Sequence, residues 1–148
     1  MVRPGRRARH EAPTPSDWVP APLPRSAGLF APVLAHTFTE LGVSASLWVS
    51  GDWWHPLCET QNVTLFEYEY GVAASRHEYN RKCLSRAIEE RRPLLGQHAG
   101  FRDLFVPVED ARSVPAVLVV GPFAVERPTA ADVLQRWHDL TGFQGRVS

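Results

Sequence analysis

A short stretch in the second half of the chain holds a histidine, a glycine and an aspartate within six positions, in the order Gln97-His98-Ala99-Gly100-Phe101-Arg102-Asp103. A dense apolar run over residues 104–108 follows it directly. An imidazole, a carboxamide and a carboxylate at the start of a buried strand are groups that orient a small molecule by hydrogen bonds. The stretch therefore indicates a small-molecule pocket, with His98, Asp103 and Gln97 as polar contacts.

Each of these residues also has a structural interpretation, which the sequence leaves open. His98 could pair with a backbone carbonyl at the start of the strand. Asp103 could form a surface ion pair with Arg102 or Arg76. Gly100 could let the backbone approach a ligand closely or simply permit a turn.

Aromatic residues supply the apolar wall that such a pocket needs. Three tryptophans fall within seven residues, around the turn Ser50-Gly51-Asp52. Their alternative role is bulky packing in the core. For the ligand-contacting wall we select the following residues: Trp48, Trp54, Tyr68, Cys83, Phe101 and Phe105.

The sequence gives weaker support for a metal site or a catalytic site. A zinc-type site would need Cys58, Cys83 and His98 with His55, but none of these forms a close-spaced pair, so we expect no metal and no cofactor. An enzyme with Cys83 as nucleophile is also not expected, because a thiol in the middle of an apolar helix face has a raised pKa. Glu67 and Glu69 alternate with aromatics and are expected on a solvated face.

Composition excludes several classes of function. The 148 residues are 44% hydrophobic and carry 16 basic and 16 acidic residues, a net charge of +0. A nucleic-acid partner is therefore not expected, since such affinity rests on excess positive charge. No apolar run approaches the ~20 residues of a membrane span. Two cysteines without a dense spacing pattern favour a reducing cytoplasm.

The positioning elements follow from hydrophobic periodicity. Residues 1–25 are rich in proline and arginine and predict a disordered tail, and residues 26–148 predict a single domain. Helices are expected from Leu29 to Leu41 with Pro32 in the first turn, from a Ser75/Glu78 capping box to Pro93, and from a Thr129/Asp132 box to Gly142. Strands are expected over 43–49, from Trp53, over 62–70, through the 104–108 run and over 114–120. This order indicates an α+β fold, a PAS/GAF-like antiparallel sheet with helices packed mainly on one face.

Residues 29–123 resemble the PocR-like sensory domain family. The resemblance is carried by Leu41-Gly42-Val43-Ser44-Ala45-Ser46, by Cys58, by Asn80-Arg81-Lys82-Cys83, and most strongly by His98-Ala99-Gly100-Phe101 with Asp103-Leu104-Phe105-Val106-Pro107-Val108. It implies a cytoplasmic input domain of a bacterial regulator or signalling enzyme that binds a small organic molecule, such as a simple diol or hydrocarbon derivative. The family often has a cysteine directly before the His-Ala-Gly, where this chain has Gln97, which argues against a thiol or metal centre.

Two functions are therefore expected to compete. The first is small-ligand sensing, with a homodimer and a fused or separate output domain as partners and the last helix leading toward that domain. The second is a ligandless interaction or dimerisation module. The second predicts an exposed apolar patch on the first or last helix and a core filled by the tryptophans.

Overall fold

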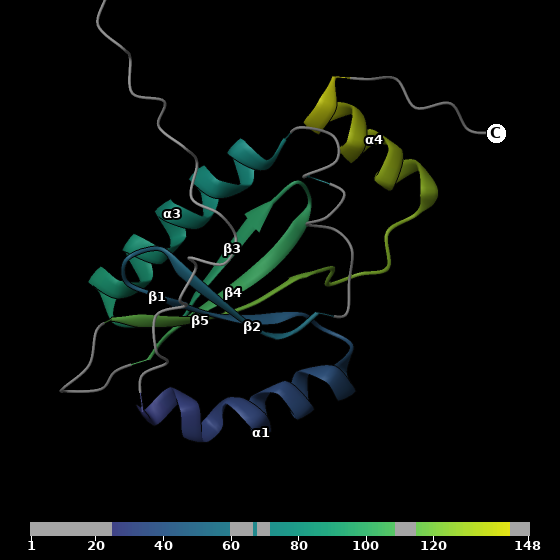
Figure 1. The fold of residues 1–148 in the computed structure, drawn as a ribbon. Coiled ribbons are helices and arrows are strands. Elements are labelled where there is room, and N and C mark those ends of the chain that lie inside the picture. The colour runs from purple at the N-terminus through teal and green to yellow at the C-terminus, as the bar shows by residue number, and fades with distance from the viewer. Residues whose placement is uncertain (1–24, 60–66, 68–71, 109–114, 143–148) are drawn as a thin grey trace, which may run out of the picture.

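The computed structural model describes residues 25–59, 67, 72–108 and 115–142. Its helices and strands are, in chain order, α1 (Arg25–Leu41), β1 (Ala45–Val49), β2 (Trp53–Cys58), α3 (Ala73–Glu90), β3 (Leu94–His98), β4 (Phe101–Val108), β5 (Ala116–Phe123) and α4 (Ala130–Thr141) (Figure 1). The fold is α+β, as predicted. Most of the tail and all but Glu67 of the strand expected over 62–70 lie outside the described residues.

The five strands form one antiparallel sheet in the order β2-β1-β5-β4-β3. β5, an almost wholly buried strand, lies at the centre, as its continuous apolar run from Ala116 to Val120 predicts. Strands β1 and β2 form one half of the sheet, and β3 and β4 form the other.

Side chains alternate between two cores, one on each face of the sheet. Ala45, Leu47 and Val49 of β1 point to the first core, which Leu34 and Phe38 of α1 cover. The second core has Phe105 at its centre and is covered by α3 through Leu84, Ala87 and their neighbours. The expectation of helices mainly on one face is therefore wrong for α1, which lies on the face opposite to α3 (Figure 1). Alternation along a strand reports two faces but not which helix covers each.

Two helix starts differ from the sequence prediction. α1 begins at Arg25 and contains Pro32 in its interior, whereas the prediction placed that proline in the first turn. α3 begins at Ala73 after Val72, and no side chain caps it, so the Ser75/Glu78 capping box is wrong. The box of α4 is confirmed, since Thr129 accepts from the amide of Asp132 and the Asp132 carboxylate accepts from the amide of Thr129.

The stretch 97–103 is a tight hairpin rather than the start of one strand. β3 ends at His98, which pairs with Phe101 of β4, and Ala99 and Gly100 make the turn with φ of 50° and 79°. Both turn residues have positive φ, as a two-residue hairpin turn of type I′ requires. Gly100 thus serves the turn, and a Cβ there would collide with the side chain of Arg136.

No helix within the described ranges combines the length and apolar character needed to cross a bilayer.

Candidate functional site

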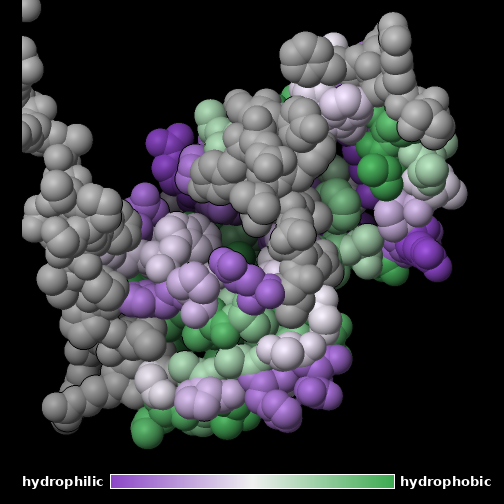
Figure 2. All heavy atoms as spheres, turned by 45° about the vertical axis from the view of Figure 1, so that its right-hand side comes forward, coloured by the Kyte–Doolittle hydropathy of each residue, from purple (hydrophilic) through white to green (hydrophobic). Residues whose placement is uncertain are grey.

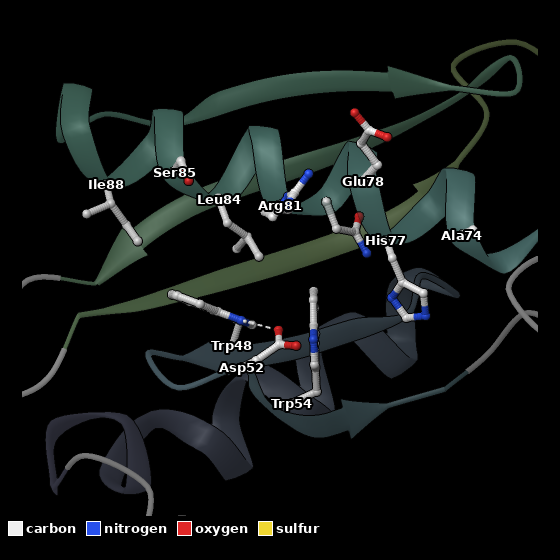
Figure 3. Close-up of a pocket in the computed structure, with 11 residues that line it drawn as sticks. Trp48, Asp52, Trp54, Ala74, His77, Glu78, Arg81, Leu84, Ser85 and Ile88 are labelled. Atoms are coloured by element: carbon white, nitrogen blue, oxygen red, sulfur yellow. Dashed lines mark hydrogen bonds between the residues drawn. The ribbon is translucent and has the colours of Figure 1, made fainter.

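α3 covers only part of its face of the sheet. Its main contacts with the sheet are with β3, β4 and the central strand β5. On the same face, the side chains of β1 and β2 flank a groove between the helix and the β1–β2 hairpin (Figure 3). The groove has a volume of about 730 Å³, which lies within the ~300–1,000 Å³ typical of small-molecule sites.

Two indoles form the strand side of the groove. Trp48 of β1 and Trp54 of β2 are direct cross-strand partners, so both point to the same face. Trp54 is 37% exposed, which is high for so large an apolar side chain. Trp53, its chain neighbour, points to the opposite face and packs on the first core.

The turn between these strands brings a carboxylate to the indoles. Gly51 and Asp52 both have positive φ, at 97° and 64°. Asp52 Oδ1 accepts a hydrogen bond of 3.2 Å from the Trp48 indole Nε1. Figure 3 shows the Asp52 carboxylate between Trp48 and Trp54, facing α3 across the groove.

The helix side of the groove is mixed. Leu84 and Ile88 are apolar, and the remaining helix residues are polar or small: Ala74, His77, Glu78, Asn80, Arg81 and Ser85. Glu78 forms an ion pair of 2.9 Å with Lys82, and this lysine lowers the pKa of Glu78.

A second polar region lies under the first turns of α3 and is closed. Arg76 is 5% exposed and donates to both oxygens of Glu67, at 2.7 and 2.9 Å, and to Asp103 Oδ2 at 2.9 Å. Both carboxylates are 2% exposed. We call these three residues with Tyr79 and His98 the buried cluster.

Tyr79 and His98 complete the cluster from two sides. The Tyr79 hydroxyl donates to Asp103 Oδ2 at 3.1 Å, and the His98 ring stacks on Tyr79 with centroids 5.0 Å apart. His98 Nε2 lies 3.8 Å from Glu67 Oε1, beyond hydrogen-bond distance, and has no hydrogen-bond partner among the described residues.

Two glycines make room for the cluster. A Cβ at Gly96 of β3 would collide with the Tyr79 hydroxyl, and one at Gly121 of β5 would lie 2.6 Å from Asp103 Oδ1. The β4–β5 register shifts between Arg102 and Leu104, so Asp103 sits at a bulge that redirects its side chain.

Burial dominates the electrostatics of the cluster. It raises the pKa of Asp103, an effect that Arg76 opposes by attracting the charged form. Burial lowers the pKa of His98, and the positive charge of Arg76 lowers it further. Burial also raises the pKa of Tyr79, so its phenol remains a neutral donor.

The two cysteines lie on opposite faces of the sheet. Cys58 packs on the first core, and Cys83 packs on the second. Within the described residues, no three His, Cys, Asp or Glu side chains are grouped so that they could hold a metal ion. Burial raises the pKa of the Cys83 thiol, which makes it a poor nucleophile.

The selected site residues are therefore not brought into one pocket. Only Trp48 and Trp54 line the groove. Asp103 and His98 belong to the buried cluster, and Phe105 and Cys83 pack beside it in the second core. Phe101 lies under the Arg136 guanidinium of α4 at 5.4 Å, Gln97 is exposed on the sheet's edge strand, and Tyr68 lies outside the described residues.

Three residues of these two regions were missed or misjudged. Glu67 was expected on a solvated face, which is wrong, because Arg76 holds it in the interior. Arg76 shares the inward face of α3 with Cys83, Leu84 and Ala87, and an arginine on an apolar helix face was the available signal. Asp52 was seen only as turn chemistry.

A scan against models of protein families, a search of curated proteins and a search of solved structures each found no match to this chain.

Proposed function

We propose that this chain is a ligand-binding sensory domain of a bacterial signalling or regulatory protein, which takes a small organic molecule in the groove between α3 and the β1–β2 hairpin. The groove with its two facing indoles is the observation that carries this proposal. The two indoles give the groove an apolar wall, which is what small-molecule sites have beside a few polar groups. A small molecule with apolar surface gains from contact with this wall.

The PAS/GAF-like fold and membership of the PocR-like family are part of the same proposal. A five-stranded antiparallel sheet, with helices on its faces and a groove beside one helix, is compatible with a PAS/GAF-like fold. The PocR-like resemblance rests on the sequence motifs alone. We further propose that the domain binds rather than transforms its ligand, since a groove lined by two indoles and a few polar side chains suits binding.

The His98-to-Val108 motif has a different role in this proposal from the one first expected. Asp103 has a cation and a phenol as partners and is 2% exposed, so it has little capacity for a ligand hydroxyl. We assign it to holding α3 on the sheet. The ligand contacts then fall to Trp48, Trp54 and the groove side of α3.

A second candidate function has its own observation. Phe30 and Val33 of α1 are each 62% exposed, and Leu29 and Leu41 are exposed as well. Figure 2 shows hydrophobic side chains gathered along the lower edge of the molecule, where α1 lies. An apolar helix face of this kind favours the interaction or dimerisation module.

A thermal-shift screen with small alcohols, diols, aromatics and amines tests the first candidate. A ligand that prefers the folded state raises the melting temperature with its concentration. We expect at least one class to do so in the wild type and to lose its effect in Trp54→Leu. Leu95→Ala, which changes an exposed residue on the far edge of the sheet, is the control and should keep it. No stabilisation by any compound, together with a dimer in solution that Val33→Asp abolishes, would favour the second candidate instead.

A further inference from the structure

The corner of the groove formed by Trp48, Asp52 and Trp54 has the composition of a site for an organic cation. Two aromatic faces and one carboxylate meet there (Figure 3). The faces of indole rings carry negative electrostatic potential and attract ammonium groups, and tryptophan does so best. Alkylated ammonium ions gain in addition from apolar contact with the rings.

The Asp52 carboxylate forms no ion pair within the described residues. Among the described residues, this carboxylate accepts a hydrogen bond from a neutral donor, the Trp48 indole, which holds the carboxylate in place without adding a positive charge. The positive φ of Asp52 is unusual for a residue other than glycine, and it belongs to the turn that places this side chain beside the rings.

The other charged groups near the groove belong to α3, on the side opposite this corner. Glu78 is paired with Lys82 and is also attracted by Arg81, so the acidic and basic groups of α3 act on one another. Asp52 is on the opposite side of the groove, on the hairpin (Figure 3). The corner itself therefore presents one carboxylate and two aromatic surfaces, and Arg81 of α3 contributes a positive charge across the groove.

We propose that the ligand class of this groove is a small organic cation with an alkylated ammonium group, held between the Trp48 and Trp54 indoles against the Asp52 carboxylate. This inference rests on the proposed function and narrows it to one chemical class. It goes beyond the diols and hydrocarbon derivatives that the family resemblance implies.

A matched pair of probes separates charge from shape. Choline and dimethylbutanol, the neutral alcohol in which carbon replaces the choline nitrogen, have nearly the same volume. Titration of the full chain by tryptophan fluorescence and calorimetry gives both affinities. We expect choline to bind about two- to fivefold more tightly, because cation–π contacts at exposed sites such as this corner contribute a factor of that order.

Two substitutions test whether the Asp52 carboxylate is the group that attracts the cation. Asp52→Asn keeps an oxygen for the Trp48 indole and tolerates the positive φ, so the hairpin should fold. It should weaken choline binding about two- to fivefold, as the loss of an exposed ion pair does, and leave dimethylbutanol binding unchanged. Glu89→Gln removes one negative charge from an exposed position of α3 outside the groove and should leave both affinities unchanged.

The results distinguish a failure of the cation inference from a failure of the proposed function. Equal affinities for the two probes, or choline binding that Asp52→Asn does not weaken, would overturn the cation inference and leave the proposed function standing. Binding of neutral compounds from the screen without any binding of choline would do the same. If no compound of any class binds, both the inference and the proposed function fail.

Discussion

α3 has two contrasting polar regions beside it on the same face of the sheet. Toward β3 and β4 lies the buried cluster, where two carboxylates are both paired with one arginine. Toward β1 and β2 lies the groove, where the indole of Trp54 is partly exposed and the Asp52 carboxylate has no cation beside it among the described residues. Both regions contain aromatic rings and acids. They differ in whether the carboxylates already form an ion pair among the described residues.

This difference indicates that the buried cluster and the groove have different roles. A buried carboxylate must be paired, and pairing leaves it with little to offer a ligand. Asp103 and His98 carry the motif on which the family resemblance is strongest, yet they join the helix to the sheet. Trp48 packs partly against the second core, and Trp48, Asp52 and Trp54 all line the groove. The comparison predicts that changes in the cluster affect stability and that changes in the groove affect binding.

The largest expected effect comes from Arg76→Met. The variant leaves Glu67 and Asp103 buried without their cation, which should lower the free energy of unfolding by about 3–5 kcal/mol. Urea unfolding followed by circular dichroism measures the loss. Arg86→Met, which removes an exposed pair with Glu90 on the same helix, is the matched control and should change little. Equal effects of the two substitutions would contradict a structural role for the cluster.

Gly96→Ala should have the next largest effect. Its methyl group would collide with the Tyr79 hydroxyl and approach Cys83 Sγ, so the phenol must leave Asp103. We expect a loss of about 1–3 kcal/mol, as for other over-packed sites. Gly28→Ala, with no atom close to the added methyl group, should cause no loss. A stable Gly96→Ala protein with an unchanged tyrosine environment would show that Tyr79 is not confined by β3.

A smaller and pH-dependent effect is expected from His98→Gln. The folded state lowers the pKa of His98 below its usual 6.5, chiefly by burial, so the unfolded chain binds more protons below that value. The wild type should therefore lose stability relative to the variant as the pH falls from 7 through 6.5 toward the folded pKa. The stabilities of both proteins, measured by urea unfolding at several pH values, test this. Asp103 has the opposite effect on stability at lower pH in both proteins. Burial raises its pKa above 3.8, so its contribution to stability decreases as the pH rises above that value. A gap between the two proteins that is independent of pH would contradict the shift.

Trp54→Leu should have the smallest effect on stability. The indole is partly exposed and lies at the sheet's edge strand, so the free energy of unfolding should change by no more than about 0.5 kcal/mol. Ligand binding should nevertheless be lost. Trp53→Leu, one residue away on the opposite face, should instead destabilise the first core. A strongly destabilised Trp54→Leu protein would place this residue with the core and not with the groove.

Local patterns in the sequence predicted the fold class, the alternation of β1, the turn at Ser50-Gly51-Asp52 and the cap of α4. They missed the hairpin at Ala99-Gly100, because alanine rarely adopts the positive φ found there. Pairing between distant segments was harder still. The sequence indicates Arg76 only as one of two possible surface partners of Asp103, and it places Glu67 in solvent. In the structure both carboxylates pair with Arg76 in the interior. Periodicity indicates which face a residue occupies, whereas burial and partners depend on which distant segment covers that face.

The central claim is that the ligand occupies the groove and not the buried cluster. The most direct measurement follows the indole N–H resonances of ¹⁵N-labelled protein as a compound from the screen is added. The account predicts that the Trp48 and Trp54 signals shift with the ligand, while those of Trp53 and Trp137 stay in place. Unchanged Trp48 and Trp54 signals, together with shifts of the backbone amide signals of His98 and Asp103, would contradict this expectation.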